Sequence, residues 1–222
     1  MSRFDEIINQ ITKKECVVAD IGSDHAFVAL RLLDKGIVKT IYNVEINKIP
    51  LQNSINNTAP YLKTGKVKNI INDGLKDWNY DKHFDYVVIS GMGGNNIIYI
   101  IENIDKDIIV DHFILIPNNN ADKLRSYLSS KGYYFEFEKV VMERSHFYQL
   151  IHVTKSKTKN SLFAKTKYDF YFGVQNLKNR DSMFEKMLLE RLKYIKNSGA
   201  EKFNDKIREE IKIINDYFKK TI

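Results

Sequence analysis

The chain has 222 residues, 43% of them hydrophobic and 28% charged, which is typical of a soluble protein of one domain, or of one domain with an appendage. It begins without an apolar signal segment, contains no run of about 18 apolar residues and has a single cysteine, Cys16, so we expect a cytoplasmic protein without a membrane span or a disulfide. The net charge of +7 is concentrated late in the chain, because residues 155–222 hold 17 basic and 9 acidic side chains whereas the first 154 residues hold 18 and 19.

Short apolar runs alternate with segments of helical periodicity along the first part of the chain. The apolar runs predict strands at 16–21, 40–45, 67–71, 86–89 and 113–116. Helical spacing predicts helices at 4–13, 26–35 and 51–57, one after Gly94 and one through Leu124 and Leu128. Residues 135–142 and 147–153 are expected to close the sheet as an antiparallel pair. This order predicts an α/β fold with a doubly wound, mostly parallel, Rossmann-like sheet of seven strands.

A polar, basic stretch at 154–161 is predicted to be a linker, and two amphipathic helices follow it. One apolar stripe precedes Ser198-Gly199 and a second follows it: Phe184, Leu188, Leu192 and Ile195, then Phe203, Ile207, Ile211, Ile214 and Phe218. We therefore expect residues 1–155 to form a Rossmann-like domain and residues 160–222 to form a basic, coiled-coil-like α-helical hairpin. Its charge suits a polyanionic partner, while a solvated lysine-rich surface and an oligomerisation hairpin remain alternatives.

Acids and glycines gather where the predicted parallel strands end. The first four strands are followed in turn by Asp20 and Gly22, by Glu45, by Asp73 and Gly74, and by Ser90 and Gly91. Because open parallel sheets bind ligands outside the carboxyl ends of their strands, these residues predict one binding site. For a nucleoside sulfonium, Glu45 is placed to accept both ribose hydroxyls and Asp73 to accept the adenine amino group. Asp20 is placed to accept from loop amides or from an amino group of the ligand. The alternative is that these residues only cap strands and helices.

The loop at 20–26 distinguishes this site from one for a nicotinamide dinucleotide. Dinucleotide-binding domains place glycines in a G-x-G-x-x-G pattern, which brings a pyrophosphate onto a helix N-terminus. Here Asp24 and His25 occupy that place. A carboxylate repels a pyrophosphate but attracts a sulfonium or an amino group, so the loop favours S-adenosylmethionine as the cofactor.

A set of segments resembles the bacterial tRNA (adenine-22-N1)-methyltransferases. These segments are Asp20 to Ala26, Asn72-Asp73-Gly74-Leu75, Ser90-Gly91-Met92-Gly93-Gly94, Pro117-Asn118 with Leu124-Arg125, and Glu143 before Tyr148. The resemblance covers residues 1 to about 155 closely, and the helical tail matches in kind. It implies transfer of a methyl group from S-adenosylmethionine to N1 of adenosine 22 in tRNA. The chain departs from the family pattern at Ile49-Pro50, where Gly-Pro is expected, at Phe172-Gly173-Val174, where Phe-Gly-Pro is expected, and at Gln149, where Glu is expected.

On this interpretation, the residues of the site divide into a cofactor-binding and a catalytic set. The cofactor-binding residues are Asp20, Gly22, Ser23, Asp24, His25, Glu45, Asn72, Asp73, Gly74 and Ser90, and the catalytic residues are Ser90, Gly91, Asp24 and His25. N1 of adenine carries a free lone pair, so the reaction needs alignment in a dry pocket rather than a strong base. Ser90 and Gly91 are expected to hydrogen-bond near the transferring methyl, and Asp24 or His25 to fix the base or the amino-acid part of the cofactor. A helix-capping role for His25 is the alternative.

The expected partner is tRNA, with no metal and no membrane, and a monomer is favoured. Adenosine 22 must leave the folded tRNA to react, and the basic tail is expected to grip phosphates. His146 and His152 do not have the spacing of metal ligands. Two alternatives remain, a methyltransferase with another substrate and a non-catalytic RNA-binding protein. Transfer of a labelled methyl group to unmodified tRNA distinguishes them.

Overall fold

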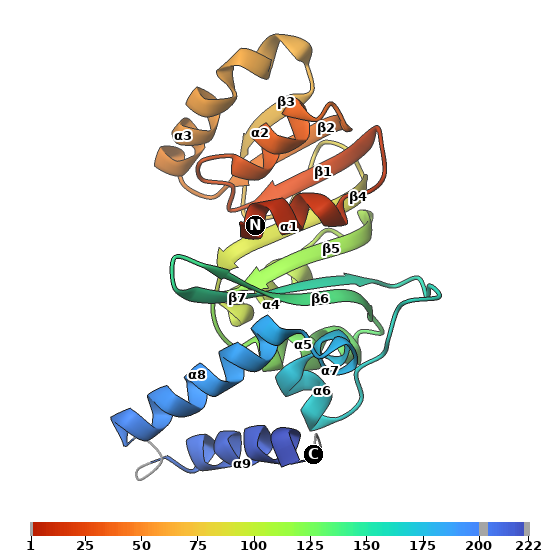
Figure 1. The fold of residues 1–222 in the computed structure, drawn as a ribbon. Helices are drawn as coiled ribbons and strands as arrows, with labels where there is room; N and C mark the ends of the chain where they lie inside the picture. The colour runs from red at the N-terminus through yellow and green to blue at the C-terminus, as the bar shows by residue number, and fades with distance from the viewer. Residues whose placement is uncertain (1, 200–203, 220–222) are drawn as a thin grey trace.

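The computed structural model describes residues 2–199 and 204–219. A single seven-stranded sheet forms its centre, in the order β3-β2-β1-β4-β5-β7-β6 (Figure 1). The strands are β1 (Cys16–Ile21), β2 (Val38–Glu45), β3 (Val67–Ile71), β4 (His83–Met92), β5 (Ile109–Pro117), β6 (Tyr134–Glu143) and β7 (His146–Thr154). The first five strands run parallel, and β7 is antiparallel to both of its neighbours, which confirms the predicted fold class.

The strand order reverses at β1, which lies between β2 and β4. Val18 and Ala19 of β1 have no exposed area, because helices cover both faces of the sheet and leave a central strand no contact with solvent. The carboxyl ends of β1 to β4 and the loops that follow them form one edge of the sheet, which we call the rim. Ligands bind at such a reversal of strand order in open α/β sheets.

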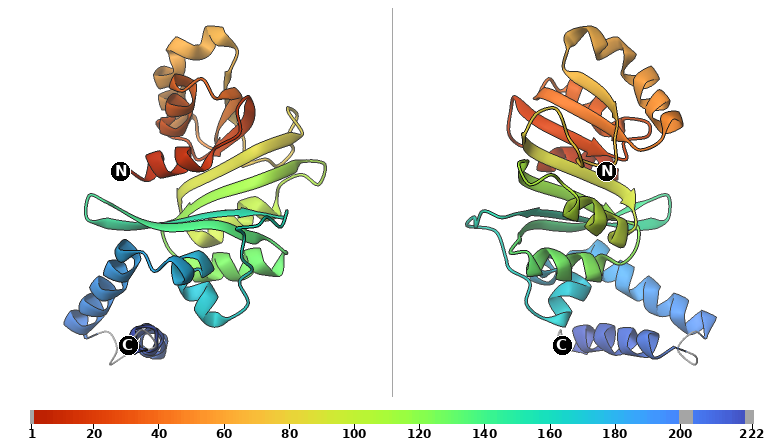
Figure 2. Two further views of the ribbon diagram at one scale, coloured as in Figure 1. Left: turned by 45° about the vertical axis from the view of Figure 1, so that its right-hand side comes forward. Right: turned by 180° about the vertical axis from the view of Figure 1, so that it is seen from behind.

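Helices cover both faces of the sheet, and the last two along the chain project from the body. They are α1 (Arg3–Gln10), α2 (Phe27–Asp34), α3 (Lys48–Thr58), the 3-10 helix η1 (Ala59–Thr64), α4 (Gly94–Glu102), α5 (Ala121–Ser130), α6 (Lys167–Phe172), α7 (Val174–Asn179), α8 (Ser182–Ser198) and α9 (Asp205–Lys219). α1 and α2 lie on one face, and Figure 2 shows α4 and α5 on the other, each layer with its own buried core. None of the described helices combines the length and the apolarity needed to cross a membrane.

The segment after β7, predicted to be a linker, is tied to the sheet just past its predicted end. Leu162 exchanges two backbone hydrogen bonds with Phe135 of β6, over 2.7 and 2.9 Å. Two short helices then follow, α6 and α7, which the sequence analysis did not predict. A capping box of Thr166 and Asp169 begins α6. The two long helices therefore begin only after Asp181, whose side chain caps α8.

A buried ion pair joins α5 to the last two strands and to the short helices. Arg125 donates from Nε to Glu138 over 2.6 Å and from Nη2 to Gln149 over 2.8 Å, and neither charged side chain has any exposed area. Arg125 also donates to the carbonyl of Phe170 over 3.2 Å, and the N–H of Gln175 donates to Glu138 over 3.0 Å. We call these residues the Arg125 cluster. Gln149, which departs from the family pattern, accepts one of its hydrogen bonds.

α8 and α9 run in opposite directions and project to the side of the molecule where the parallel strands end (Figure 1). Phe184 and Leu188 of α8 share one apolar cluster with Ile214 and Tyr217 of α9 and with Phe172 of α6. Arg191 of α8 also donates to both carboxylate oxygens of Glu210 in α9, over 2.6 and 2.8 Å. The predicted helical pair is therefore present and is anchored on the body. Residues 200–203 and 220–222 of the predicted unit lie outside the described residues.

Candidate functional site

The loop between β1 and α2 makes its sharp turn at Gly22. The backbone there has a φ of +76°, and its N–H donates to the carbonyl of Val44 in β2 over 2.9 Å. The positive φ favours glycine, and a Cβ here would lie 2.3 Å from Cε of Met92, so the end of that side chain would have to move. Met92 is not among the residues predicted to form the site, yet its side chain lies directly against the loop.

Asp20 lies next to the end of β1 and is buried, with 4% of its surface exposed. Its carboxylate accepts no hydrogen bond from the described part of the chain. Burial and the neighbouring charge of Glu45 raise the pKa of Asp20 to about 7. A buried carboxylate without a partner is costly, and a bound cation or hydrogen-bond donor would remove that cost.

Glu45, the last residue of β2, is also buried, and it holds the loop after β1. Its Oε1 accepts a hydrogen bond from the backbone N–H of Asp24. Burial raises the pKa of Glu45, and the hydrogen bond from Asp24 opposes that rise. The loop therefore engages Oε1, while Oε2 accepts no hydrogen bond from the described residues; acceptance of both ribose hydroxyls by Glu45 stays a prediction.

Helix α3 fixes the outer side of the same loop. Ser54 donates to the carbonyl of Asp24, and its hydroxyl lies 3.1 Å from that of the buried Ser23. Asn57 donates to the carbonyl of His25 over 3.0 Å. The side chains of Asp24 and His25 remain 54% and 51% exposed, with His25 Nε2 3.4 Å from Asp24 Oδ2. Both side chains are thus presented at the surface of the rim.

The turn after β3 is built by Asn72. Its side chain donates to the carbonyls of Gly74 and Lys76 over 3.0 and 2.7 Å, and its N–H donates to the carbonyl of Glu45 over 2.9 Å. Asp73 is half-buried, and among the described residues its carboxylate accepts only a long contact of 3.4 Å from the hydroxyl of Tyr99. Asn72 therefore shapes the turn, and the carboxylate of Asp73 can still accept from a ligand.

The end of β4 packs against the chain that leaves β5. A Cβ at Gly94 would lie 2.6 Å from the carbonyl oxygen of Asn120, so only glycine allows this approach. Asn118 donates to the carbonyl of Gly91. The hydroxyl of Ser90 is buried and has no hydrogen-bond partner among the described residues. The sequence analysis did not include residues 118–120 in the site; pairing of β4 with β5 is the signal that places them beside it.

Two clefts open beside the rim. One, of about 600 Å³, lies between α1, the start of α2 and the β6–β7 turn, and its lining includes His25. Aromatic and cationic side chains dominate that lining: Phe4, Phe27, Arg31, Arg144 and Tyr148. The other, of about 240 Å³, lies between the end of β5 and the two long helices and is lined by Asn118, Gln149, Met187 and Arg191, among others. The first cleft offers the flat and cationic groups that nucleic acids bind.

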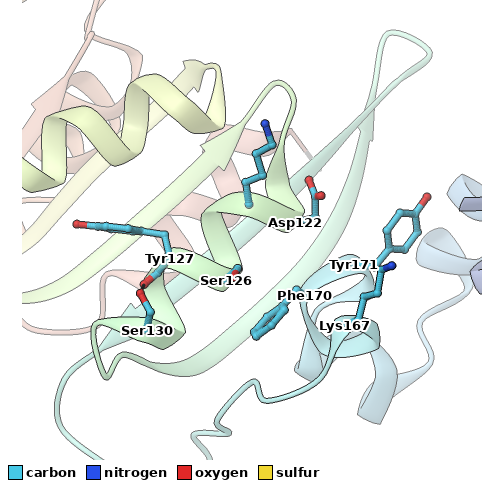
Figure 3. Close-up of a pocket in the computed structure, with 8 residues that line it drawn as sticks. Asp122, Ser126, Tyr127, Ser130, Lys167, Phe170 and Tyr171 are labelled. Atoms are coloured by element: carbon cyan, nitrogen blue, oxygen red, sulfur yellow. Dashed lines mark hydrogen bonds between the residues drawn. The ribbon is translucent and has the colours of Figure 1, made fainter. Parts of the chain in front are cut away.

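A third hollow, of about 470 Å³, lies between α5 and α6. Figure 3 shows Tyr127 and Ser130 on the α5 side and Phe170 and Tyr171 on the α6 side. It adjoins the cleft at the end of β5, because Asp122 and Tyr171 line both. None of the residues predicted from the sequence to form the site lines this hollow.

Comparisons with known proteins give one consistent family. The family model described as tRNA (adenine(22)-N(1))-methyltransferase matches residues 18–221. A curated relative from Mycoplasma genitalium, assigned provisionally as a tRNA methyltransferase, is 29% identical over 144 residues, which cover 64% of this chain. The aligned part of the chain spans 63% of the length of that relative.

Solved structures match over nearly the whole chain. A Streptococcus agalactiae protein of the NADB-Rossmann superfamily is 25% identical, with a TM-score of 0.80 over 99% of this chain and 94% of its own. TrmK of M. capricolum, solved with S-adenosyl-homocysteine, is 24% identical, with a TM-score of 0.79 over 99% of this chain and 95% of its own. These similarities extend through the two long helices, so the helical pair is part of a shared architecture.

Proposed function

The chain belongs to the tRNA (adenine(22)-N(1))-methyltransferase family, and we propose that it transfers a methyl group from S-adenosylmethionine to N1 of adenosine 22 in tRNA. The observation that carries the proposal is the buried carboxylate of Asp20, which has no partner among the described residues and lies where the strand order reverses. The rim residues around it have the donors and acceptors that a nucleoside with a positively charged amino-acid tail requires.

The side chains of the rim fit S-adenosylmethionine in character. Asp20 supplies a carboxylate to which no described residue donates, and Gly22 provides a turn without a side chain. The free oxygen of Glu45 suits a ribose hydroxyl, and the carboxylate of Asp73 suits the adenine amino group. A nicotinamide dinucleotide fits less well, because Asp24 lies at the loop where a pyrophosphate would bind.

The reaction requires the protein to align the cofactor methyl group with N1 of adenine and to place charged groups beside them. The cofactor supplies an electrophilic methyl group, and N1 of adenine supplies its own lone pair, so no side chain needs to remove a proton. We assign Ser90 to a hydrogen bond with the substrate base or the cofactor, because its buried hydroxyl has no other partner among the described residues. Methylation leaves the adenine ring positively charged, and the carboxylate of Asp24 at the rim is our candidate to stabilise it.

We place the tRNA across the rim, the first cleft and α8. The extruded adenosine would stack on aromatic side chains of the cleft, and Arg31 and Arg144 would meet the flanking phosphates. On α8, Lys186, Lys193 and Lys196 are exposed, and the helix projects to the side of the rim (Figure 1). We therefore assign residues 1–155 to catalysis and the helical part of residues 160–222 to tRNA binding, in a cytoplasmic enzyme that acts as a monomer.

The test is methyl transfer from labelled S-adenosylmethionine to an unmodified tRNA transcript, followed by mapping of the modified nucleoside. The expected product is one N1-methyladenosine per tRNA, at position 22. The matched control is the same transcript with guanosine at position 22, which should take up no label. Equal labelling of both transcripts, or methylation of neither, would contradict the proposal.

The role of α8 is tested by replacing three exposed lysines with glutamine, in the variant Lys186→Gln/Lys193→Gln/Lys196→Gln. If each lysine neutralises a phosphate, the slope of log affinity for tRNA against log salt should fall by about 2–3. Cofactor affinity should stay unchanged. The matched control is Lys35→Gln/Lys39→Gln/Lys106→Gln, which removes three exposed lysines at the opposite end of the sheet. Equal losses in both variants would refute a specific role for α8.

A further inference from the structure

We propose that His112, Glu136 and His152 form a binding site for a divalent transition-metal ion of the zinc class. The three residues come from β5, β6 and β7, which are neighbours in the sheet. Their ligand atoms converge within 4.8 Å of one another. Along the sequence His152 has a histidine nearby only in His146 of the same hairpin, and strand pairing supplies the partners that this spacing could not indicate.

The ligand atoms have the separations of a tetrahedral metal site. His152 Nε2 lies 3.1 Å from His112 Nδ1, His112 Nδ1 lies 3.4 Å from Glu136 Oε2, and His152 Nε2 lies 3.7 Å from that same oxygen. Zinc ligands at about 2.0–2.1 Å in tetrahedral geometry are separated from each other by about 3.3–3.4 Å. Shifts of a few tenths of an ångström would therefore bring all three atoms to bonding distance of one ion.

Outer contacts hold both imidazole rings in position. Nδ1 of His152 lies 3.2 Å from Oε1 of Gln10, so an N–H at Nδ1 donates there and leaves the lone pair of Nε2 directed at the other two ligands. The ring of Tyr86 stacks on His112, with centroids 5.1 Å apart and planes inclined by 22°. A fixed tautomer and fixed ring planes are the usual support of a histidine that binds metal.

The location of the group, rather than its ligand set, favours a structural ion, because three protein ligands with water as the fourth is the set of catalytic zinc sites. The side chain of His152 is 7% exposed, and those of His112 and Glu136 are 28% and 17% exposed, so water can reach one side and complete four ligands. None of the three residues lines a cleft described above. His112 lies in the first half of β5, whereas the rim is at the opposite end of that strand. A bound ion would therefore tie β5, β6 and β7 together away from the reaction.

A neighbouring group offers a matched control. His83, Asp85 and Asp111 also come close together, but Asp85 is already engaged by the ammonium group of Lys13 and by the N–H of Val17. A cation there would have to displace Lys13. His83 is 54% exposed, so its loss should disturb the fold little and should leave zinc binding unchanged.

The test is calorimetric titration of the tag-free, chelator-treated full chain with zinc chloride, together with the visible spectrum of the cobalt(II)-loaded protein. The expected result is one ion per chain, a tetrahedral cobalt spectrum and a raised Tm with zinc. His112→Gln and Glu136→Gln should each weaken binding by more than the 10–100-fold that a lost outer contact costs, and Gln10→Ala by about 10–100-fold. His83→Ala should bind like the unaltered chain.

Because these variants can also lose stability, each is first shown to fold by its circular dichroism and by a cooperative urea unfolding transition. Failure of the unaltered chain to take up one zinc ion would overturn the proposal. So would full zinc binding by both folded variants, His112→Gln and Glu136→Gln, or loss of binding in His83→Ala. Methyl-transfer activity does not enter this test, so its outcome is independent of the proposed function.

Discussion

The Arg125 cluster and the rim both bury carboxylates, but they treat them in opposite ways. Glu138 is fully buried, and its two oxygens accept hydrogen bonds from Arg125 and Gln175. Asp20 is nearly as buried, yet it has no partner in the described chain, and Glu45 has only a backbone N–H. A buried charge is tolerated where it is paired, so the unpaired ones at the rim indicate a partner that comes from outside the chain.

The two regions also differ in what they join. The Arg125 cluster connects α5, β6, β7 and the short helices that support α8 and α9, so it belongs to the folding of the whole molecule. The rim consists of loops that follow separate strands and that hold one another by a few hydrogen bonds. Substitutions in the two regions should therefore have different effects. Those in the Arg125 cluster should lower stability, and those at the rim should lower ligand affinity.

The largest expected effect is the loss of the buried partner of Glu138. Arg125→Met should lower the free energy of unfolding by about 3–5 kcal/mol, because it leaves a buried carboxylate without its counter-charge. Urea unfolding measures this value. The double variant Arg125→Met/Glu138→Leu should recover much of the loss, since it removes both charges. If Arg125→Met were as stable as the unaltered chain, the cluster would not differ from the rim in its contribution to stability.

Glu45→Gln, at the rim, should lower ligand affinity and leave stability almost unchanged, unlike Arg125→Met. The variant replaces a charged acceptor of a ligand hydroxyl with a neutral one, and such hydrogen bonds contribute about 1.5–3 kcal/mol. We expect a loss of about 10–100-fold in affinity for S-adenosylmethionine by calorimetry, with a free energy of unfolding that changes by less than about 1 kcal/mol. The amide oxygen of glutamine can still accept from the N–H of Asp24. Unchanged cofactor affinity would remove Glu45 from the site.

The contribution of Asp20 to the free energy of unfolding depends on pH. The folded protein holds its pKa at about 7, above the ordinary value of 3.8, so folding takes up a proton between these pH values. The stability that Asp20 contributes is fully present below pH 3.8 and is lost as pH rises through 7. An asparagine side chain is neutral, like the protonated acid, at every pH. The variant Asp20→Asn should therefore be more stable than the unaltered chain by at least about 1 kcal/mol at pH 8.

The measurement for Asp20 is the difference between two unfolding curves, for Asp20→Asn and the unaltered chain, taken from pH 4 to pH 8. Taking the difference removes the contributions of other titrating groups. The stability advantage of the variant should grow with pH and level off above pH 7. An advantage that is constant with pH would contradict the raised pKa. Cofactor affinity at pH 8 should fall at the same time, because the carboxylate is lost.

The sequence predicted the strands and the rim better than it predicted the contacts between elements. Apolar runs identify the strands because both faces of the sheet are covered, and the ends of these runs identify Asp20 and Glu45. The strand β4 extends beyond its predicted apolar run and includes Asp85, because Lys13 and a backbone N–H pair with that carboxylate. Local sequence does not show such a pairing.

The missed parts have the same cause. α6 is one short, aromatic-rich helix, and its apolar side chains match no simple period; its capping box and its contacts with Arg125 and the long helices hold it. Residues 118–120 reach the site only because β5 pairs with β4. The metal-ligating group arises from three paired strands in the same way. Long-range pairing, rather than local propensity, therefore decides what the sequence could not predict.

Ser90 should give the smallest effect, and it tests the contrast most sharply because its hydroxyl is neutral. An unpartnered buried hydroxyl contributes nothing to the fold, so Ser90→Ala should change the free energy of unfolding by no more than about 1 kcal/mol and should tend to raise it. A neutral hydrogen bond is worth about 0.5–1.5 kcal/mol, so kcat/KM for methyl transfer should fall by about 2–10-fold.

Ser129→Ala is the matched control, because the hydroxyl of Ser129 donates to the carbonyl of Ala164 in the interior. Its loss should lower stability and leave kcat/KM unchanged. If Ser90→Ala were instead the less stable of the two variants and fully active, an unsatisfied polar group at the rim would no longer indicate a ligand.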